Sequence, residues 1–460
     1  MKLETLKAAV RGTVVADSDP GYPETCDALL FNGRKPPRRP RVIVRAADAE
    51  DVRRAVRYAA AEGLAVSPRG GGHSWSGVAQ QAGMAIDLRG IAHIRVDAAA
   101  RLADIGPAAT NRQLAAVLGA AGLAFPLGHC GSVPASGYLL GGGLGWNANS
   151  WGVACFSVES IEAVLADGSL AVASRRENPD LFWAAQGGGP LFPGIVTGYR
   201  LRLREAPGAI RTALRIYPAE AAGALAGWME TLAAEGPASL EMTAKFCPAP
   251  PPFAAQAERL AIGIATVFAR HESEAAVILA HADSLAPGGE IAAVPPMPTP
   301  FGALYDQVDA SYPEGSRMAV DALWSDAPGA LFAALSEGMA TAPGAGCHAI
   351  ATLRSARAPV PGEGAFSMHG RAFGAVYGLW QDPAEDARGT GWVRGVADAA
   401  APVTKGVYVG EADLERPGRI HRAYAPAALE RLLALRGRYD PAGLFRREIA
   451  GLGLSATRAA

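Results

Sequence analysis

Two short glycine-rich segments carry the residues whose types and spacing could do chemistry. Residues 69–74 read Arg-Gly-Gly-Gly-His-Ser, and residues 128–133 read Gly-His-Cys-Gly-Ser-Val. Because glycine has no Cβ, the backbone N–H groups of such a segment can approach an anionic pyrophosphate closely and form an anion-binding nest. His73, directly after the first nest, would lie beside whatever molecule carries the phosphates. Cys130 precedes a third segment, 141–145, where the backbone again can pass close to a ligand.

Further segments occur in the same order as in one flavoprotein family. They are Ala-Val-Leu-Ala-Asp-Gly at 163–168, Asn-Pro-Asp-Leu-Phe-Trp-Ala at 178–184, three glycines at 187–189, Ile-Val-Thr at 195–197 and Tyr-Asp-Pro at 439–441. Taken together with the two glycine-rich segments, they resemble the berberine-bridge-enzyme-like oxidases of the vanillyl-alcohol-oxidase superfamily. The resemblance implies bound FAD and a PCMH-type FAD-binding domain made of two subdomains.

The resemblance also implies how the flavin is held. In that family a histidine bonds to the 8α-methyl carbon of the flavin and a cysteine bonds to ring carbon 6, and the matching residues here are His73 and Cys130. The first bond needs a neutral imidazole, and the second needs a thiolate, activated by the flavin and by nearby N–H dipoles. The other cofactor-binding residues that the resemblance implies are Arg69, Gly70, Gly71, Gly72, Ser74, Gly77, Gly128, Ser132, Val133, Gly137, Tyr138, Gly141, Gly142, Leu144, Gly145, Ile195 and Val196.

The catalytic base is the point at which this chain departs from the family pattern. The family usually closes its site with Tyr-x-Asn followed by an aromatic residue that assists deprotonation, whereas this chain has Tyr408, Val409, Gly410 and Glu411. If Glu411 is buried, desolvation raises its pKa toward a value useful to a general base. If it is exposed, it is an ordinary surface charge. Tyr377 and Tyr408 are the other candidates for the base.

The reaction that the resemblance implies is an oxidation by FAD. Hydride leaves an alcohol or amine carbon of a small or medium-sized organic substrate for flavin N5, and O2 then reoxidises the flavin and gives H2O2. Val133 stands where the family places a side chain near flavin C4a, and valine there resembles the oxygen-reactive members. Two alternatives stay open: a dehydrogenase that uses another electron acceptor, and a flavoprotein that binds its substrate without turnover. Tyr305, Tyr312 and Trp324 either line the substrate pocket or belong to the core.

Composition argues against several other classes of protein. The chain has 460 residues, a formal net charge of −1 and 50% hydrophobic residues, which gives no electrostatic reason to expect nucleic acid as a partner. No apolar run approaches the roughly 20 residues that span a bilayer, and the N-terminus lacks the apolar region of a signal peptide. We therefore expect a cytoplasmic protein with no membrane partner. The sequence does not indicate an oligomeric state.

Other cofactor motifs are missing from the sequence. The five cysteines are scattered, with no disulfide framework and no zinc-ligand spacing, and the histidines show no paired ligand spacing, so we predict no metal site. There is also no GxGxxG between a strand and a helix and no P-loop signature. A Rossmann dinucleotide site and a P-loop site are therefore both unsupported.

The elements that must position these residues are predicted to form an α+β fold. We expect an FAD-binding domain over residues 1–205, with subdomains that divide near residue 97. A substrate-binding domain, with an antiparallel sheet covered by helices, would span 206–402, and a C-terminal segment, 403–460, would return to the FAD-binding domain. A chain of this length is indeed too long for one ordinary core.

Local signals place several elements within these domains. Asp48 is a predicted N-cap for a helix that Gly63 ends, and a second helix is expected from Asn111 to near Gly122. Asp167-Gly168 between two apolar runs predicts a hairpin. Asn178 before Pro179 predicts another capped helix. The segments 219–235, 272–285 and 386–401 are expected to be helical, and the proline-rich segments 248–252 and 295–300 are expected to interrupt secondary structure.

Overall fold

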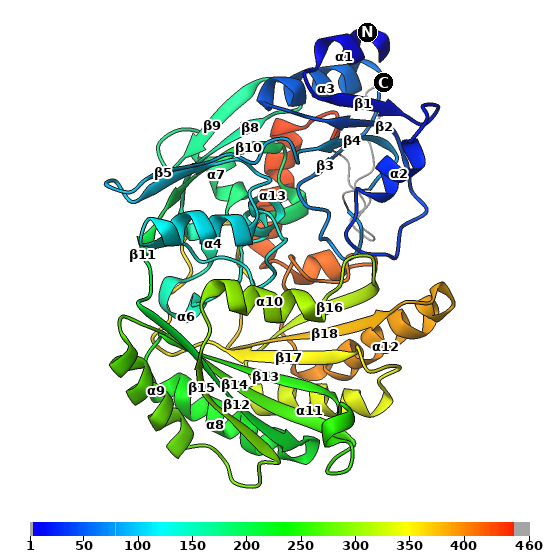
Figure 1. Ribbon diagram of the computed structural model, residues 1–460. Helices are drawn as coiled ribbons and strands as arrows, with labels where there is room; N and C mark the ends of the chain where they lie inside the picture. Colours follow the sequence, from blue (N-terminus) through cyan, green and yellow to red (C-terminus); the bar gives the residue numbers. More distant parts are fainter. Residues whose placement is uncertain (1–2, 79, 446–460) are drawn as a thin grey trace.

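The first part of the chain forms a small sheet with a helix packed on it. The computed structural model describes residues 3–78 and 80–445, and Figure 1 shows their arrangement. The strand order is β1-β2-β4-β3, with β1 antiparallel to β2 and the other pairs parallel. These strands are β1 (Thr13–Ala16), β2 (Pro40–Arg45), β3 (Val66–Arg69) and β4 (Gly83–Asp87), with α1 (Leu3–Ala9) and α2 (Tyr22–Asp27) beside them.

Helix α3 (Ala49–Ala61) forms as its sequence predicts. The Asp48 side chain accepts a hydrogen bond from the N–H of Asp51, which is the N-cap contact expected there. Val52 and Val56, one turn apart, are fully buried, and they belong to the same core as the strands of the first sheet. The spacing of apolar residues thus decides which face of α3 is buried.

A second sheet is antiparallel throughout and has the order β5-β6-β10-β8-β9. The predicted hairpin is confirmed, because β8 and β9 pair across the turn where Gly168 has a φ of 75°. The strands are β5 (Ile94–Asp97), β6 (Leu102–Ile105), β8 (Val158–Val164), β9 (Leu170–Ser174) and β10 (Ile195–Arg202), and a short pair joins β7 (Leu123–Ala124) to β11 (Arg204–Glu205). The helices of this part are α4 (Asn111–Ala120), α5 (Ala135–Leu140), α6 (Ala148–Trp151) and α7 (Pro179–Ala185).

A seven-stranded antiparallel sheet forms the lower part of the molecule in Figure 1, with the order β15-β12-β14-β13-β17-β18-β16. We call it the large sheet. Its strands are β12 (Ala209–Pro218), β13 (Leu240–Pro248), β14 (Arg259–Ala269), β15 (Ala292–Pro298), β16 (Arg317–Ser325), β17 (His348–Leu353) and β18 (Ala372–Trp380). Its helices are α8 (Ala222–Glu235), α9 (Glu272–Ser284), α10 (Phe301–Ser311), α11 (Pro328–Gly338) and α12 (Asp386–Ala399).

The two faces of the large sheet have different surroundings. Helices α8, α9, α11 and α12 contact one face and share with it an apolar core. Helix α10 instead contacts α4 of the first part of the chain. On the opposite face, Phe373 and Tyr377 of β18 cluster with Cys155 and Tyr408, which come from elsewhere in the chain. This second face therefore looks toward the first two sheets, and the predicted antiparallel sheet covered by helices is confirmed.

After the large sheet the chain returns to the first two sheets. The backbone of Trp324, in β16, exchanges hydrogen bonds with Lys405 and Gly406. Helix α13 (Pro426–Tyr439) then packs against α7, and the N–H of Val66 donates to the carbonyl oxygen of Leu444 at 2.8 Å. The remainder of the predicted C-terminal segment, beyond residue 445, lies outside the described residues. None of the helices within the described ranges is long and apolar enough to cross a membrane.

Two local predictions were wrong. Asn178 precedes α7 but does not cap it with its side chain, because the residue has a φ of 44° and its side-chain amide donates to the carbonyl oxygen of Val172. The segment 295–300 does not interrupt secondary structure, because residues up to Pro298 belong to β15. β15 is an edge strand, where the missing N–H of proline leaves no pairing position empty.

Candidate active site

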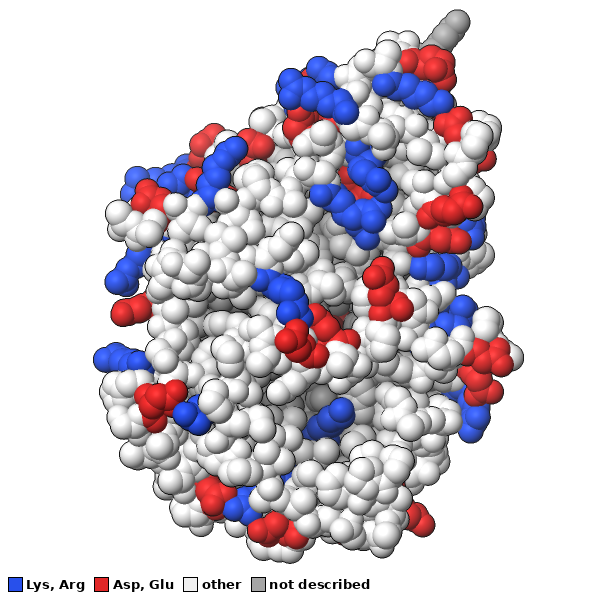
Figure 2. All heavy atoms as spheres, viewed as in Figure 1, with Lys and Arg blue, Asp and Glu red and all other residues white. Residues whose placement is uncertain are grey.

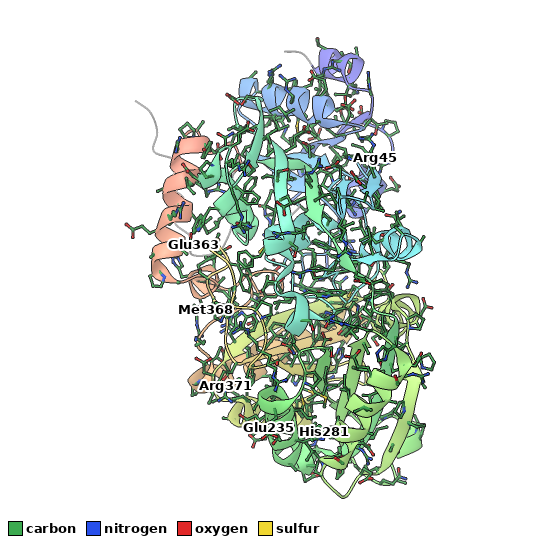
Figure 3. All side chains as sticks on the ribbon, turned by 90° about the vertical axis from the view of Figure 1, so that its left-hand side faces the viewer. Arg45, Glu235, His281, Glu363, Met368 and Arg371 are labelled. Atoms are coloured by element: carbon green, nitrogen blue, oxygen red, sulfur yellow. The ribbon has the colours of Figure 1, made fainter. Side chains whose placement is uncertain are left out.

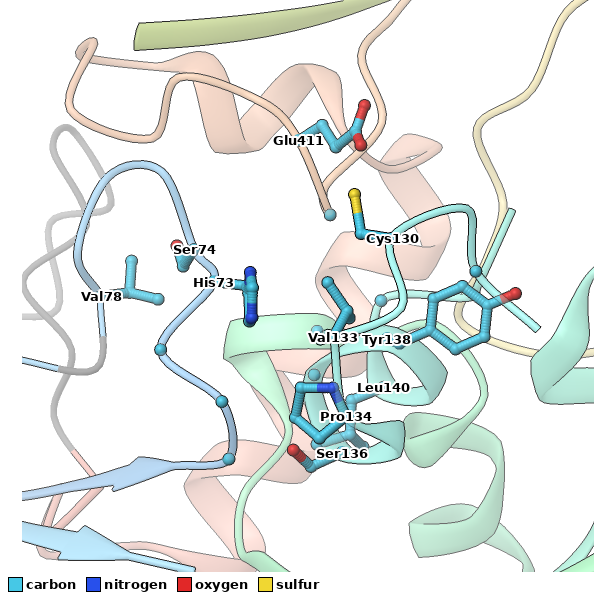
Figure 4. Close-up of a pocket in the computed structure, with 18 of the residues that line it drawn as sticks. His73, Ser74, Val78, Cys130, Val133, Pro134, Ser136, Tyr138, Leu140 and Glu411 are labelled. Atoms are coloured by element: carbon cyan, nitrogen blue, oxygen red, sulfur yellow. The ribbon is translucent and has the colours of Figure 1, made fainter. Parts of the chain in front are cut away.

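The predicted site residues converge on one cavity between the glycine-rich loops and the large sheet. Its volume is about 250 Å³, and Figure 4 shows His73, Cys130 and Glu411 around it, with the Cys130 thiol pointing toward Glu411. The loops after β3 and before α5 form one side. Asp309 at the end of α10, Tyr312 just after it, and Glu411 in the returning segment form the other. We call these the loop side and the sheet side.

His73 is held on the loop side as a neutral ring. The ring stacks on Phe31, with centroids 4.3 Å apart. Burial, together with the positive charge of Arg69, lowers the pKa of His73 to about 4. The imidazole therefore keeps a free lone pair at neutral pH, which is the form that a nucleophilic histidine needs.

Arg69 holds the backbone of the first glycine-rich loop through hydrogen bonds to carbonyl oxygens. Its guanidinium donates to the carbonyl oxygens of Gly70 at 3.1 Å and Gly71 at 2.9 Å, and also to Leu29. The N–H groups of Gly70, Gly71 and Gly72 donate to no other group in the described part of the chain. The arginine thus engages the carbonyl oxygens of the loop and leaves its N–H groups available for an anion.

Cys130 lies opposite His73 in a different electrostatic setting. Burial and the negative charges of Glu411 and Asp309 raise the pKa of its thiol to about 12. Before a ligand binds, the thiol is therefore protonated at neutral pH. The surrounding protein charges therefore oppose ionisation of this thiol.

Glu411 is the carboxylate of the sheet side. The hydroxyl of Tyr377 donates to Glu411 Oε2 at 2.9 Å. Burial raises the pKa of Glu411, while the Tyr377 hydrogen bond and the positive charge of His129 act in the lowering direction. The interpretation of Glu411 as an ordinary surface charge is therefore wrong, and the burial that a general base requires is present.

Aromatic rings surround this carboxylate. Tyr377 stacks on His348 with centroids 5.0 Å apart, and Tyr312 donates its hydroxyl hydrogen to His348 Nε2 at 2.8 Å, since His348 Nδ1 lies 3.0 Å from the carbonyl oxygen of Gly346. Trp75, from the loop side, lies 6.4 Å from both Tyr312 and Tyr377. The sheet side thus carries an aromatic wall, and the Glu411 carboxylate is hydrogen-bonded to it through Tyr377.

Tyr408 has a different role from Tyr377. Its hydroxyl accepts a hydrogen bond from the N–H of Gly143 at 3.1 Å. Burial and the nearby negative charge of Glu411 raise the pKa of Tyr408. Tyr408 thus ties the returning segment to the third glycine-rich loop, and a phenol held in this way is poorly suited to accept a proton.

The polar atoms around the cavity fit a phosphate-bearing cofactor. Ser136 Oγ and Asn111 Oδ1 line the cavity, are buried, and have no hydrogen-bond partner within the described ranges. The Ser136 hydroxyl and the free N–H groups of the loop at 70–72 can donate to a phosphate, whereas Asn111 Oδ1 can accept a hydrogen bond from a donor of the ligand, and the described lining residues include no lysine or arginine. Buried polar atoms are ordinarily paired, so these atoms mark where a polar ligand binds.

Comparisons with known proteins agree with this geometry. Residues 40–174 match the family described as FAD binding domain. The chain is 38% identical to FAD-linked oxidoreductase ptmO of Penicillium ochrochloron over 223 residues, which is 48% of this chain and 49% of that protein. It therefore spans about half the length of that relative. With FAD-linked oxidoreductase nodO of Hypoxylon pulicicidum it shares 28% identity over 92% of this chain and 94% of the relative.

A solved structure shares the whole fold. Physcomitrella patens BBE-like 1 superposes with a TM-score of 0.84, covering 98% of this chain and 99% of that one at 20% identity. The chain therefore has the fold of this BBE-like protein, and in sequence it is similar to proteins named FAD-linked oxidoreductases. The resemblance of its motifs to that family is therefore confirmed, and so is the prediction of an FAD-binding domain.

Most of the predicted site residues line the cavity. The lining residues are Gly70, Gly71, Gly72, His73, Ser74, Gly128, Cys130, Ser132, Val133, Gly137, Tyr138, Gly141, Leu144, Ile195, Val196, Tyr408 and Glu411. Arg69, Gly77, Gly142, Gly145 and Tyr377 do not line it. Gly142 and Gly145 instead allow close packing, since a Cβ would meet the Phe366 ring at 2.5 Å and the Tyr138 hydroxyl at 2.3 Å, respectively. Of the three aromatic residues with two possible roles, Tyr312 lines the cavity, while Tyr305 and Trp324 belong to apolar clusters.

Sequence reasoning missed other lining residues. Asn111 was predicted only as the first residue of a helix, and Ser136 lies just past the second glycine-rich segment. Both could therefore have been predicted as site residues from their closeness to the motifs. Phe31 and Asp309 are distant in sequence from every motif. No local signal identifies them, because only the packing of α10 and of the loop after α2 brings them to the cavity.

Proposed function

We propose that this protein is an FAD oxidase in which His73 and Cys130 both bond to the flavin, and which oxidises a CH–OH or CH–NH group of a small or medium-sized organic substrate. The observation that supports this most directly is that His73, Cys130 and Glu411 line one cavity. Two relatives in sequence carry FAD-linked oxidoreductase in their names. When bound, FAD supplies the electron chemistry: it accepts hydride at N5 and returns two electrons to O2, which becomes H2O2.

Each covalent link is a balanced oxidation. One hydrogen leaves the His73 ring nitrogen or the Cys130 sulfur, one hydrogen leaves the flavin carbon, and the new N–C or S–C bond forms. The two electrons and two protons released pass to O2 and give H2O2. The neutral state of His73 suits the first link without further activation.

Glu411 is the proposed general base. It accepts the O–H or N–H proton of the substrate while the C–H hydride leaves, and Tyr377 holds its Oε2 by the 2.9 Å hydrogen bond. Because burial raises the pKa of Glu411, the proton it accepts is bound more tightly than by an exposed carboxylate. The flat walls of Trp75 and Tyr312 would place a ring-shaped substrate beside this carboxylate.

The charge of the lining also limits the substrate. The carboxylates of Glu411 and Asp309 lie on the cavity, and no lysine or arginine is among its lining residues. An anionic substrate would therefore be repelled without a compensating partner. A neutral alcohol or a protonated amine fits this cavity better.

A denaturing experiment tests the covalent links first. Acid-precipitated wild-type protein should stay yellow and show one added FAD in its intact mass. Each single variant, His73→Ala and Cys130→Ala, should retain FAD through the remaining link, whereas the double variant should release it. Flavin that washes free of the acid-denatured wild type would contradict the two-link proposal.

A second experiment separates the oxidase from its alternatives. A panel of neutral alcohols and amines is mixed anaerobically with the protein, and the flavin absorbance is followed. Bleaching by a substrate, followed by one H2O2 per turnover in air, supports the oxidase. Bleaching with reoxidation only by an artificial dye indicates a dehydrogenase, and tight binding without bleaching indicates a flavoprotein without turnover.

A further inference from the structure

The peptide unit that follows Cys130 is held at both of its polar atoms. The side-chain amide of Asn111 donates to the carbonyl oxygen of Cys130 at 3.0 Å. The N–H of Gly131, in the same peptide unit, donates to Asp309 Oδ1 at 2.9 Å. Because the peptide unit is planar and includes the Cα of Cys130, these two contacts hold the backbone from which the thiol side chain of Cys130 extends.

The two contacts come from opposite sides of the cavity. Asn111 begins α4 on the loop side, whereas Asp309 belongs to α10 on the sheet side. Arg112 joins the two helices, with Nη2 3.0 Å from Asp309 and Nη1 2.8 Å from Asp306. Figure 2 shows acidic side chains gathered over α10 next to basic ones. The orientation of Cys130 therefore depends on how α10 docks against α4.

Gly131 is shaped to receive this carboxylate. A Cβ at residue 131 would lie 2.7 Å from Asp309 Oδ2 and 3.0 Å from Arg112 Nε. Any side chain at residue 131 would therefore push the Asp309 carboxylate away from the peptide. Glycine therefore allows this close approach without displacement of the carboxylate.

We propose that Asp309 is a positioning residue for the Cys130 link: it holds the backbone of Cys130 from the sheet side, whereas among the described residues it makes no hydrogen bond or ion pair with His73 and acts on that residue only through its charge. This inference rests on the proposed covalent attachment. The step that it assists is the one written above, in which the S–H hydrogen and the hydrogen on ring carbon 6 leave, the S–C bond forms, and O2 takes up both electrons and both protons.

The contribution of Asp309 is geometric and not electrostatic. Its negative charge opposes the ionisation of the Cys130 thiol, so a charge effect alone would make the link harder to form. Removing the charge while keeping the acceptor oxygen should therefore preserve the link, and removing the acceptor should weaken it. The two substitutions separate geometry from charge.

The test compares four variants with the wild type. Asp309→Ala removes the acceptor, Asp309→Asn keeps an acceptor oxygen, Gly131→Ala displaces the carboxylate, and Asp306→Ala removes only the exposed partner of Arg112. Each purified protein is digested, and peptide mass spectrometry gives the fractions of Cys130 and of His73 that carry flavin. The His73 fraction reports folding and FAD binding within the same sample.

We expect the flavin-linked fraction of Cys130 to fall several-fold in Asp309→Ala and Gly131→Ala, with the His73 fraction unchanged. Asp309→Asn and Asp306→Ala should match the wild type. A wild-type fraction in Asp309→Ala would overturn the inference, and so would an equal loss in Asp309→Asn. If wild-type Cys130 carries no flavin at all, the two-link proposal itself fails, which is a distinct result.

Discussion

The loop side and the sheet side of the cavity are built in different ways. On the loop side, His73 and the glycines around it come from continuous segments whose order in the sequence is their order around the site. On the sheet side, Tyr312 and Tyr377 lie against each other, and Glu411 reaches Tyr377 only because the chain returns from the large sheet to the first two. Sequence can therefore vary on the sheet side without disturbing the cofactor cradle.

The two sides also differ in how their charges are arranged. The loop side presents N–H groups and a neutral imidazole, because Arg69 is turned away from the cavity toward loop carbonyl oxygens. The sheet side presents the carboxylates of Glu411 and Asp309. An anionic cofactor end and a neutral or cationic substrate are thus directed to opposite sides of one cavity.

The largest expected effect is on the base of the sheet side. Glu411→Gln keeps the shape of the side chain but cannot accept a proton, so we expect kcat to fall by about 10²–10⁴-fold. The base acts when deprotonated, and burial raises its pKa. Wild-type activity should accordingly rise with pH through a pKa above that of an ordinary glutamate, and be lost as the pH falls through it. Anaerobic stopped-flow reduction of the flavin measures both.

The covalent flavin content is the control for this variant. It should not fall in Glu411→Gln, since the negative charge of Glu411 opposes ionisation of the Cys130 thiol and its removal does not make that link harder to form. We call the fall of the flavin-reduction rate toward low pH the acid limb. If Glu411→Gln reduces its flavin within a few-fold of the wild-type rate and has the same acid limb, another group takes the proton.

A buried ion pair holds the returning segment on the large sheet. Asp321 of β16 is fully buried, and its oxygens lie 3.1 Å from Arg419 Nε and 2.5 Å from Arg419 Nη2. The N–H of Asp413, two residues after Glu411, also donates to Asp321 at 3.2 Å. Asp321→Ala leaves the arginine buried without its main partner, and we expect the free energy of unfolding to fall by about 3–5 kcal/mol. Urea denaturation measures the loss.

The double variant Asp321→Ala with Arg419→Met provides the control, because it removes both charges. It should recover much of the stability lost in the single variant, since the penalty comes chiefly from the unpaired cation. Equal destabilisation in the two variants would indicate that packing, and not charge pairing, holds this segment.

The sequence predicted the loop side far better than the sheet side, for a physical reason. Asp48 and the apolar spacing after it are enough to place α3, and Gly168 is enough to place the β8–β9 turn, because these signals act within a few residues. The glycine-rich loops are equally local. Asp309 and Phe31 carry no such signal, since their position depends on contacts between elements far apart in the chain.

Two wrong predictions show the same limit of local sequence patterns. Asparagine tolerates the left-handed conformation, so Asn178 can precede α7 while its side chain bonds elsewhere. Prolines such as those in β15 would interrupt a central strand, but an edge strand accepts them, and the sequence did not reveal that β15 lies at the edge.

Figure 3, turned by 90°, shows the large sheet and its helices packed below the first two sheets. That packing is what the local patterns could not supply.

Tyr377→Phe tests whether the Tyr377 hydroxyl lowers the pKa of the proposed base Glu411, and we expect a smaller effect than in the variants above. The Tyr377 hydrogen bond lowers the pKa of Glu411, so its loss should move the acid limb of activity to higher pH. A hydrogen bond to a charged group is worth about 1.5–3 kcal/mol, which is large enough for the shift toward higher pH to be measured. The pH dependence of anaerobic flavin reduction measures it.

Tyr312→Phe is the matched control for this shift. Its hydroxyl bonds to His348 and not to the carboxylate, so the acid limb should stay in place. An identical limb in the wild type and Tyr377→Phe would mean that the tyrosine does not act on the base.

The smallest effect is expected on the loop side, where many weak contacts share the binding of the cofactor. Ser136 Oγ is buried on the cavity without a partner among the described residues, and we expect it to bond to FAD. In the His73→Ala, Cys130→Ala background, Ser136→Ala should weaken reversible FAD binding by about 1 kcal/mol, roughly fivefold in Kd. Ser336→Ala, whose buried hydroxyl donates to Ala219 beneath the large sheet, should leave that Kd unchanged. Because the same loss of one hydroxyl is made on each side of the molecule, an equal change in both variants would trace the effect to stability and not to the cradle.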